Sequence, residues 1–436
     1  MTHQTTRRTF LKAATATAAF SIIPQNLARS FAANEKVNMA IVGVAGQGGV
    51  NREWLARLGC NIVALCDPDS KSVNDALKAH PDAKTYADFR EMLEKQSNID
   101  AVMISGPDHM HYPASLLAMK LGKHVCTEKP LTHSVWEARQ LGIAAKKYKV
   151  ATQHDHESHA LDGLRTLVEW VKSGAIGPVR EVHIWSDRPI WPQGISKRPP
   201  AKPVPPTLNW DLWLGPAPYR EYHDGLHPFN WRGYWDFGCG ALGDMGCHFW
   251  DSAFWALDLF APSTIEAEQQ GNSAETGPNW AIITYQFPAR GSLPPCTVKW
   301  YDGKKLPARP EELEADRKLP SNGSLFVGDK GKILVNDAVS PRIIPESKMQ
   351  AFERPKPFIP RVGDHKVDWL NAIKGGPPAG SDFTLFGGPL AEVVLLGNVA
   401  IRTGKKLDWD HANLKATNAP EADQYIKREY RKGWEF

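Results

Sequence analysis

The feature that most constrains the fold is a strand, a glycine-rich turn, a helix, a second strand and an acidic residue, in that order. Residues 37–42 are a short apolar stretch that predicts a strand, and a glycine-rich segment follows over 43–49. A helix is expected to run through Leu58, and a strand over 61–66 ends at Asp67. Glycines at such a turn let backbone N–H groups approach a pyrophosphate at a helix N-terminus. The pattern therefore predicts a Rossmann domain that binds a dinucleotide.

The glycine-rich turn and the acidic residue also predict which cofactor is bound. Asp67 follows Gly48 by 19 residues, a spacing at which an acidic side chain bonds both ribose hydroxyls of the adenosine half. A carboxylate there would repel a 2′-phosphate, so NAD is favoured over NADP. In the Gly-x-Gly-x-x-Gly pattern Ala45 replaces the second glycine, and Gly46 is expected to supply the close approach. The predicted contacts of the cofactor in this region are Gly43, Ala45, Gly46, Gln47, Gly48 and Asp67.

Strands and helices continue to alternate up to about residue 150. This alternation predicts a parallel sheet whose ligands lie at the carboxyl ends of its strands. Pro107 and the pair Glu128 and Lys129 fall at two such ends, so we expect them to line the cofactor site. His109 and His111 belong to a predicted loop over 107–111, where they either approach the nicotinamide or fill the start of the next helix. Helices are predicted over 75–80, 89–96, 112–121 and 134–148, and strands over 85–86, 100–105, 124–127 and 150–153.

The pattern changes beyond residue 153. Short alternating strands, a hairpin over 325–335 and late helices predict a second α/β domain with a large, open, mostly antiparallel sheet. We therefore divide the chain into a Rossmann domain over 34–153 and a substrate and oligomerisation domain over 154–436. Within the second domain, residues 189–228 are rich in Pro and Trp and predict an extended arm that covers a cleft or a neighbouring subunit.

Two groups of polar residues in this half have the spacing of a functional site. Asp244 and His248 follow a glycine-rich loop and stand four residues apart, so they share one face of a helix predicted to end at Leu257. His154, His156 and His159 have a spacing that suggests a metal site. No carboxylate-rich segment accompanies these histidines and no Cys-x-x-Cys pair is present, so we predict no metal.

The N-terminus and the charge bear on location and partners. Thr6-Arg7-Arg8-Thr9-Phe10-Leu11-Lys12 precedes an apolar run over 13–23, which predicts a twin-arginine export signal over 1–33 and a periplasmic protein; an amphipathic surface helix is the alternative. The run is too short to span a bilayer, and no later stretch is judged apolar enough, so no membrane anchor is expected.

A formal net charge of +4 without a long basic run argues against nucleic acid as a partner.

Taken together, these motifs resemble the Gfo/Idh/MocA family of glucose–fructose oxidoreductases and inositol dehydrogenases. The resemblance covers about residues 37–260 and implies a Rossmann domain, an open-sheet domain and assembly into dimers or tetramers. It also implies a catalytic Lys, Asp and His, which match Lys129, Asp244 and His248, and a Lys129–Pro130 bond that is often cis. The matching motifs are 43–48, Asp67, Pro107-x-His109-x-His111, Gly122-Lys123-His124-Val125, Glu128-Lys129-Pro130 and Asp244-x-x-x-His248.

The resemblance implies an NAD-dependent oxidoreductase that acts on a hydroxyl of a sugar or glycoside. His248 is expected to titrate near neutrality and to act as the base, with Lys129 at the alkoxide and Asp244 on a substrate hydroxyl; whether Lys129 or His248 carries the proton stays open. His159, Trp231 and Arg232 are predicted to line the sugar subsite.

Export restricts the function further. Free NAD is not expected outside the cytoplasm, and twin-arginine export carries folded proteins, so the cofactor is expected to be tightly held and regenerated in place. Two alternatives remain: an NAD-dependent glycoside hydrolase that oxidises, eliminates and re-reduces, and a non-catalytic sugar-binding protein. The motif over 243–248 looks like the dehydrogenase form, which disfavours the hydrolase.

Overall fold

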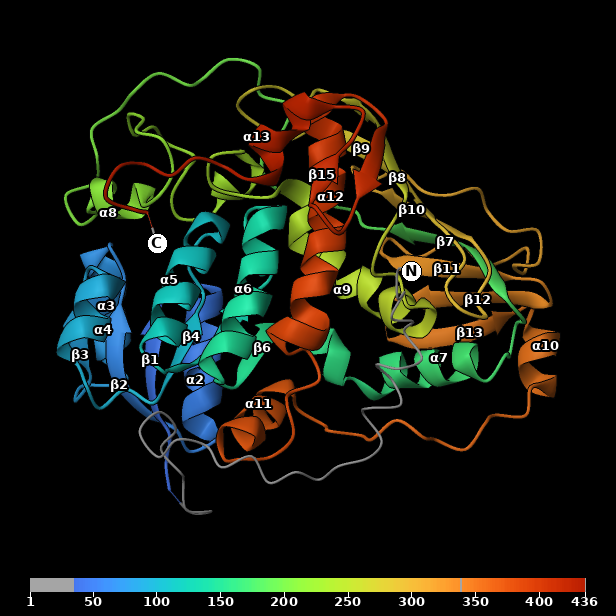
Figure 1. Cartoon of the computed structure of the whole chain (residues 1–436), viewed down its shortest axis with the longest axis horizontal. Helices are drawn as coiled ribbons and strands as arrows, with labels where there is room; N and C mark the ends of the chain where they lie inside the picture. The colour runs from blue at the N-terminus through green and yellow to red at the C-terminus, as the bar shows by residue number, and fades with distance from the viewer. Residues whose placement is uncertain (1–34, 338, 436) are drawn as a thin grey trace, which may run out of the picture.

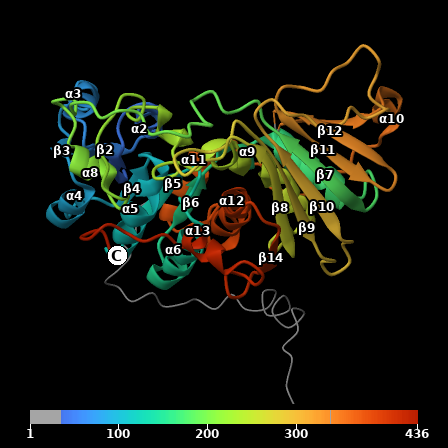
Figure 2. The ribbon, with the colours of Figure 1, turned by 90° about the horizontal axis from the view of Figure 1, so that it is seen from above.

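The computed structural model describes residues 35–337 and 339–435, shown from blue to red in Figure 1. The export signal predicted over 1–33 lies outside the described residues. Two sheets, each with its own helices, lie side by side along the long axis of the molecule (Figures 1 and 2).

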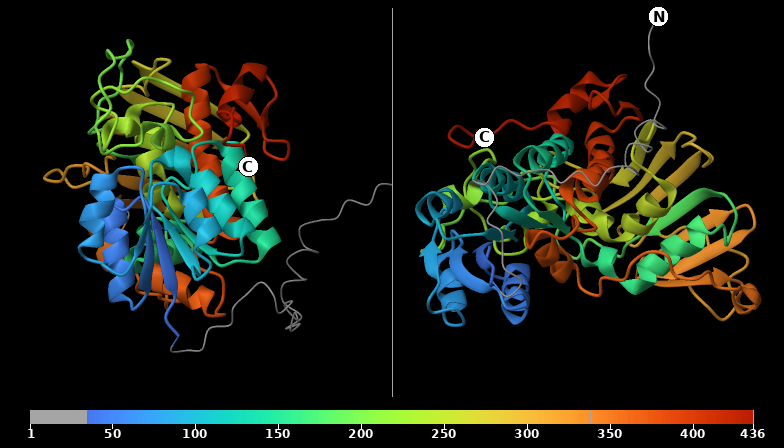
Figure 3. Two further views of the ribbon diagram at one scale, coloured as in Figure 1. Left: turned by 90° about the vertical axis from the view of Figure 1, so that its left-hand side faces the viewer. Right: turned by 60° about the horizontal axis from the view of Figure 1, so that its bottom comes forward.

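The first sheet is a six-stranded parallel sheet with the order β3-β2-β1-β4-β5-β6. Alternate residues of its central strand face opposite layers: Ala40 and Val42 pack with α4, α5 and α6, whereas Met39 and Ile41 pack with α2, α3 and α11. This layering confirms the predicted Rossmann domain (Figure 3). The elements are β1 (Asn38–Val42), α2 (Gln47–Arg57), β2 (Asn61–Cys66), α3 (Ser70–Leu77), β3 (Lys84–Tyr86), α4 (Phe89–Lys95), β4 (Ala101–Ile104), α5 (Asp108–Lys120), β5 (His124–Glu128), α6 (Val135–Tyr148), β6 (Thr152–Asp155) and, from the C-terminal half, α11 (His365–Ile373).

Three boundaries in this half differ from the sequence prediction. Helix α3 begins five residues earlier than expected because the Asp69 carboxylate caps it, accepting a hydrogen bond from the N–H of Lys71. The segment 107–111 is not a loop: α5 already begins at Asp108, directly after Pro107. Strand β6 ends at Asp155, so the boundary predicted between residues 153 and 154 falls inside the sheet.

The second sheet has nine strands in the order β13-β12-β11-β7-β10-β9-β8-β14-β15. Only the β7–β10 pair is parallel among its described strand pairs, which confirms the mostly antiparallel sheet. One face packs on α7, α9 and α12 in a shared core. The elements are β7 (Val179–Trp185), β8 (Thr264–Gln270), β9 (Trp280–Phe287), β10 (Cys296–Tyr301), β11 (Gly323–Gly328), β12 (Gly331–Asn336), β13 (Ser340–Ile344), β14 (Leu407–Asp410), β15 (Lys415–Ala416), α7 (Asp162–Lys172), α9 (Gly240–Leu257), α10 (Glu346–Ala351), α12 (Gly388–Thr403) and α13 (Asp423–Ile426).

Helix α9 includes the glycine-rich segment that the sequence prediction treated as a loop. The glycines are needed for packing. A Cβ atom on Gly246 would lie 2.7 Å from Cγ1 of Val394 on α12, and one on Gly243 would lie 2.2 Å from Cβ of Cys239. Small residues therefore let α12 approach the start of α9, at the junction of the two domains.

One helix corrects the expectation about membrane spans. Among the described residues, the segment Phe383–Thr403 is long and apolar enough to cross a membrane, with a mean hydropathy of 1.6. However, 83% of its most apolar window is buried inside the protein. The apolar composition of this segment, which contains α12, is accounted for by its place in the core.

The arm between β7 and α9 crosses back onto the Rossmann domain, where it forms the green trace above α3 in Figure 1. It contains one short helix, α8 (Trp210–Leu214), and a 3₁₀ turn, η2 (Asn230–Gly233). The N–H of Ser70 donates to the carbonyl of Thr207 at 2.9 Å, and the N–H of Asn209 donates to the carbonyl of Pro68 at 2.9 Å. The arm therefore contacts the loop that follows Asp67.

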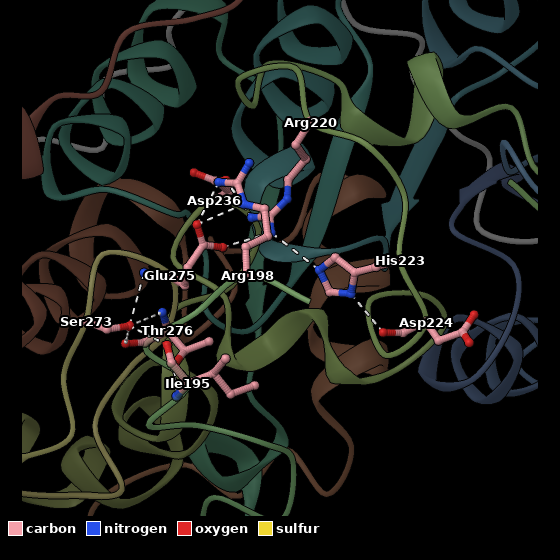
Figure 4. Close-up of polar contacts among 9 residues, drawn as sticks. All are labelled: Ile195, Arg198, Arg220, His223, Asp224, Asp236, Ser273, Glu275 and Thr276. Atoms are coloured by element: carbon pink, nitrogen blue, oxygen red, sulfur yellow. Dashed lines mark hydrogen bonds and ion pairs between the residues drawn. The ribbon is translucent and has the colours of Figure 1, made fainter. Parts of the chain in front are cut away.

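Charged residues hold the arm in place (Figure 4). The buried guanidinium of Arg220 pairs with Asp236 at 2.9 Å and with Glu275 at 2.8 Å, and Glu275 also pairs with Arg198 at 2.7 Å. On the other side, Arg431 near the C-terminus donates to the carbonyl of Gly215 at 3.0 Å and pairs with Asp211. These pairs fix the arm to the second domain, and the backbone hydrogen bonds at Pro68 and Ser70 fix it to the Rossmann domain.

A buried ion pair joins α11 to the sheet of the Rossmann domain. Lys366 is fully buried, and its Nζ lies 2.9 and 2.8 Å from the two carboxylate oxygens of Asp155 at the end of β6. Nε2 of His365 lies 2.6 Å from Oδ1 of the same carboxylate. The negative charge of Asp155 thus has its cationic partner on another element.

We expect Lys366→Met to lower the free energy of unfolding by about 3–5 kcal/mol, because it leaves the Asp155 carboxylate buried without its cation. Equilibrium denaturation in urea measures the change. Lys374→Met, at the exposed end of the same helix, is the control and should change stability little. Equal stability of the two variants would contradict the prediction.

Candidate active site

The carboxyl ends of β1 and β2 bring the glycine-rich turn and Asp67 together. The N–H of Gly43 donates to the carbonyl of Cys66 at 2.8 Å. The Asp67 carboxylate accepts hydrogen bonds from the N–H of Val44 at 3.1 Å and from the N–H of Asp69 at 3.0 Å. The predicted ribose-binding residue therefore lies against the predicted pyrophosphate-binding turn.

The shape of the turn fits a dinucleotide. Gly43 has φ +80°, and a Cβ atom on Gly48 would lie only 1.8 Å from the Gly43 carbonyl oxygen, so both positions require glycine. Ala45, Gly46 and Gln47 are exposed at the start of α2, whose first turn carries no acidic residue. The first turn of α2 therefore brings no carboxylate of its own to this end of the helix, which can take the pyrophosphate of a dinucleotide.

An ion pair between the two domains lies beside this turn. Nζ of Lys129, at the end of β5, lies 2.9 Å from Oδ1 of Asp244 on α9, and Nε of Arg232 lies 3.5 Å from the same oxygen. Burial alone would lower the pKa of Lys129, but the charges of Asp244 and Glu128 outweigh it and raise that pKa. Lys129 is therefore an ammonium held in place by a carboxylate, and the Lys129–Pro130 bond is cis.

His248 follows Asp244 by one turn of α9. Burial, with a contribution from the charge of Lys129, lowers the pKa of His248 to about 3. The expectation that this imidazole titrates near neutrality was wrong, because it did not include the burial of the helix face. The ring is neutral at physiological pH, whereas Lys129 beside it is charged.

Three residues near these groups were not identified from the sequence. The Asn51 side chain donates to Oε1 of Glu128 at 2.8 Å, and burial raises the pKa of Glu128 to about 7. Asp108 accepts a hydrogen bond from the N–H of Cys239 at 2.9 Å, and burial raises its pKa to about 7. Asp251 lies seven residues after Asp244, a spacing that repeats the helix face and could have identified it.

The two histidines of α5 contact backbone carbonyls. Nε2 of His109 lies 3.0 Å from the carbonyl oxygen of Trp213 in the arm, and burial lowers the pKa of His109 to about 3. Nδ1 of His111 lies 2.7 Å from the carbonyl oxygen of Pro130, and Nε2 lies 2.8 Å from that of Gly106. His109 thus joins the arm to the Rossmann domain, and His111 contacts the Lys129–Pro130 segment. A role of either ring at the nicotinamide stays a prediction.

The three residues that were assigned to the sugar subsite have different surroundings, although the guanidinium of Arg232 lies over the Trp231 ring at 4.4 Å. Arg232 joins the pair of Lys129 and Asp244. Trp231 is buried, and its Nε1 donates to the carbonyl of Pro228 at 3.0 Å. His159 is also buried, and its Nδ1 lies 3.0 Å from Asp251. Arg232 is therefore the member of this group that contacts the central ion pair, and sugar contact by the other two stays a prediction.

Two sequence models of one protein family match successive parts of the chain. The model described as an oxidoreductase family with an NAD-binding Rossmann fold matches residues 37–156, and the model of the family's C-terminal α/β domain matches residues 182–293. Together they include the glycine-rich turn, Asp67, Lys129, Asp244 and His248.

Curated relatives include sugar-modifying enzymes. A D-glucoside 3-dehydrogenase of Escherichia coli is 25% identical over 232 residues, which are 52% of this chain and 56% of that protein. A glycosyl hydrolase family 109 protein of Saccharopolyspora erythraea is 31% identical over 161 residues, 34% of this chain and 35% of that protein. The chain thus spans about half, or less, of the length of these relatives.

Solved structures share the fold over a longer range. The WlbA dehydrogenase of Bordetella pertussis, in complex with NADH and UDP-GlcNAcA, has a TM-score of 0.61 at 17% identity, covering 86% of this chain and 99% of that one. An aldose–aldose oxidoreductase of Caulobacter crescentus has a TM-score of 0.58 at 17% identity, covering 86% and 100%.

We expect Asp67→Ala to weaken NAD binding by roughly 10- to 100-fold, because hydrogen bonds to a charged group contribute about 1.5–3 kcal/mol. Binding of NADP should weaken less, since the repulsion of its 2′-phosphate is also removed. Calorimetric titration of cofactor-free protein measures both affinities. Asp82→Ala, an exposed acidic position of the same domain, is the control. An unchanged ratio of the two affinities would exclude Asp67 from the ribose site.

Proposed function

Because the chain belongs to the Gfo/Idh/MocA family of oxidoreductases, we propose that it oxidises or reduces a hydroxyl group of a sugar or glycoside with a tightly held NAD. The observation that carries this proposal is the convergence of two predicted sites from different domains. The charged Lys129 leaves the Rossmann sheet next to the glycine-rich turn and meets Asp244, one helical turn from the neutral His248.

The three side chains have different tasks in hydride transfer. NAD, when bound, accepts or returns the hydride at the substrate carbon. The ammonium of Lys129 donates a hydrogen bond to the substrate oxygen and stabilises the negative charge that develops there. Asp244 holds Lys129 in position and is available to a neighbouring hydroxyl. The neutral His248 has a free lone pair for the hydroxyl proton, whereas the charged Lys129 has none. With a pKa of about 3 the ring is a weak base before substrate binds, so the proton has to transfer together with the hydride.

Retention of the cofactor is supported by the arm. Its residues 207–209 pair with residues 68–70, directly after the predicted ribose ligand Asp67. His227 of the arm lies 3.3 Å from the Asp69 carboxylate. A cofactor bound along Asp67 would therefore be enclosed by a segment that is itself anchored at Arg220 and Arg431.

Export and assembly extend the proposal. The twin-arginine pattern in residues 1–33 supports folding and cofactor loading in the cytoplasm before transfer to the periplasm. A second substrate, or a later step of one reaction, would then regenerate the cofactor.

Assembly into a homo-oligomer would use the face of the nine-stranded sheet opposite α9 and α12, where alternate residues of β8 are exposed or partly exposed.

A glycoside hydrolase is the second candidate, because glycosyl hydrolase family 109 proteins are among the relatives. Besides the Saccharopolyspora protein, one from Solibacter usitatus is 32% identical over 139 residues. In this candidate the same three side chains serve an oxidation, an elimination and a reduction without net change of the cofactor. A sugar-binding protein without activity is disfavoured, because the Lys129–Asp244 pair and His248 are all present.

We expect Lys129→Met and His248→Asn each to lower the rate of hydride transfer by at least about 100-fold, because each removes a group that acts on the reacting hydroxyl. The assay follows NADH absorbance in single turnovers with a panel of sugars and glycosides. The NAD content of both variants should remain that of the wild type, and Lys120→Met, on the exposed end of α5, should be fully active.

Full activity of either active-site variant would exclude its assigned role. A chromogenic glycoside without an added acceptor separates the two candidates. Cleavage that disappears when NAD is removed would favour the hydrolase, and oxidation without cleavage would favour the dehydrogenase.

We expect Asn209→Pro to accelerate NAD release by about 2- to 10-fold, since it removes the hydrogen bond to the Pro68 carbonyl, a contact of about 0.5–1.5 kcal/mol. Asn209 has φ −78°, which proline can adopt. Asn209→Ala is the matched control, because it removes the side-chain cap of α8 but keeps the backbone N–H. Denaturing the purified protein and measuring released nucleotide gives the starting occupancy. Absence of nucleotide in the wild type, or equal release from the two variants, would contradict retention by the arm.

A further inference from the structure

A second polar cluster lies beside the proposed active site and takes no part in the mechanism above. It contains three residues. His156 directly precedes the 3₁₀ turn η1 (Glu157–Ala160), His159 lies within this turn, and Asp251 belongs to α9. Their side chains are 0%, 5% and 0% exposed. The carboxylate that the sequence analysis could not assign to these histidines therefore comes from α9, 92 residues after His159.

The ligand atoms of these three residues converge. Nε2 of His156 lies 2.9 Å from Oδ2 of Asp251, and Nδ1 of His159 lies 3.0 and 3.1 Å from the two carboxylate oxygens. One nitrogen from each ring and one carboxylate oxygen all lie within 4.8 Å of one another. Ligand atoms bound at about 2.0–2.2 Å to one ion in tetrahedral geometry lie about 3.3–3.6 Å apart, so small rotations of these side chains would bring the three atoms to a common ion.

Hydrogen bonding accounts for His159 but leaves other ring nitrogens of the cluster without a partner among the described residues. Nε2 of His156 lies 2.9 Å from the Asp251 carboxylate as an ion-pair contact, and among the described residues neither ring nitrogen of His156 has a further hydrogen-bond partner. The same holds for both nitrogens of His154, which is fully buried with its ring centroid 4.5 Å from that of His156. Orphaned polar atoms in the interior are costly and indicate a missing partner.

The charged member of the cluster, Asp251, is paired with histidines and not with Lys or Arg among the described residues. Asp251 is fully buried, and among residues 35–337 and 339–435 its ion pairs are with His156 and His159 alone. The nearby guanidinium of Arg165 bonds instead to the carbonyl oxygens of His159 and Pro360. A fully buried carboxylate that contacts two imidazole rings and no Lys or Arg side chain among the described residues is a suitable position for a bound cation.

We propose that His156, His159 and Asp251 bind a divalent transition-metal ion. Two imidazoles and one carboxylate suit Zn²⁺, and they also suit Fe²⁺ and Mn²⁺, whereas Ca²⁺ and Mg²⁺ prefer oxygen ligands. The surrounding rings form an apolar wall: Trp255 stacks on His159 at 4.4 Å between centroids, and Phe386 lies 4.3 Å from it. Such a shell limits access of solvent to the ion.

The ion would lie one turn of helix from the proposed base. Asp244, His248 and Asp251 are spaced by four and three residues, so they share one face of α9. The ion would join α9 to the segment after β6 and hold the backbone that presents His248. His156, His159 and Asp251 are therefore assigned as positioning residues. The proposal does not depend on the sugar chemistry, because it is argued from the geometry of the cluster and its test measures metal binding.

Metal content and metal-dependent stability test this assignment. Full-length protein is treated with a chelator, and Zn²⁺, Mn²⁺ or anaerobic Fe²⁺ is then titrated while binding is measured by calorimetry and Tm by thermal melting. We expect about one ion per chain and a rise of Tm by several degrees for at least one metal. Asp251→Asn and His156→Gln should weaken binding by at least about 100-fold. His80→Gln, a histidine of the Rossmann domain that pairs with Glu53, is the control and should leave metal binding unchanged.

The outcomes are distinct from those of the function assays. Substoichiometric metal with no change of Tm for all three ions would overturn the site, as would equal metal binding by the wild type and Asp251→Asn. NAD content and circular dichroism show whether each variant is folded. If the variants do not fold, X-ray absorption of the metal-loaded wild type decides: nitrogen and oxygen ligands at about 2.0–2.2 Å, including two imidazoles, support the site, and a shell of water oxygens alone overturns it.

Discussion

The proposed chemistry depends on one ion pair, between Lys129 at the end of β5 and Asp244 on α9. Arg232 also contacts Asp244 from within the second domain, at 3.5 Å, but the contact with Lys129 is shorter and crosses from one domain to the other. Because the pair is largely removed from water, breaking it would leave an uncompensated charge, so it keeps the two domains in register. Two further contacts hold neighbouring elements together. The glycines of α9 allow α12 to approach, and the buried pair of Lys366 and Asp155 joins α11 to the end of β6.

The sequence predicted the Rossmann half well because each signal there is local. An apolar strand, a glycine turn and an acidic residue at a strand end are read within about 30 residues, and their positions in the sheet follow from the right-handed connections of parallel strands. Helix boundaries were less accurate where the controlling contact was not local. The glycine-rich start of α9 resembles a loop in sequence, and its helical state depends on packing against α12, more than 140 residues later.

The same difference between local and non-local signals applies to the candidate site. Lys129, Asp244 and His248 were identified by motif, but their ionisation was not, since the pKa of His248 depends on burial by segments that no local pattern indicates. Asn51 and Asp108 carry no motif and are recognisable only by their buried contacts with Glu128 and Cys239. The histidines after β6 were judged without Asp251, because the partner carboxylate is brought to them by the fold alone.

The arm has a consequence for the order in which the molecule is completed during synthesis. Its contact with the loop after Asp67 joins residues 137 positions apart, and Arg431 then bonds to the arm across 216 residues. A ribosome-bound chain that has released only the Rossmann half would present the glycine-rich turn and Asp67 without their cover. Cofactor captured at that stage would exchange freely, and it would become enclosed only after the distant segments had been translated and had docked.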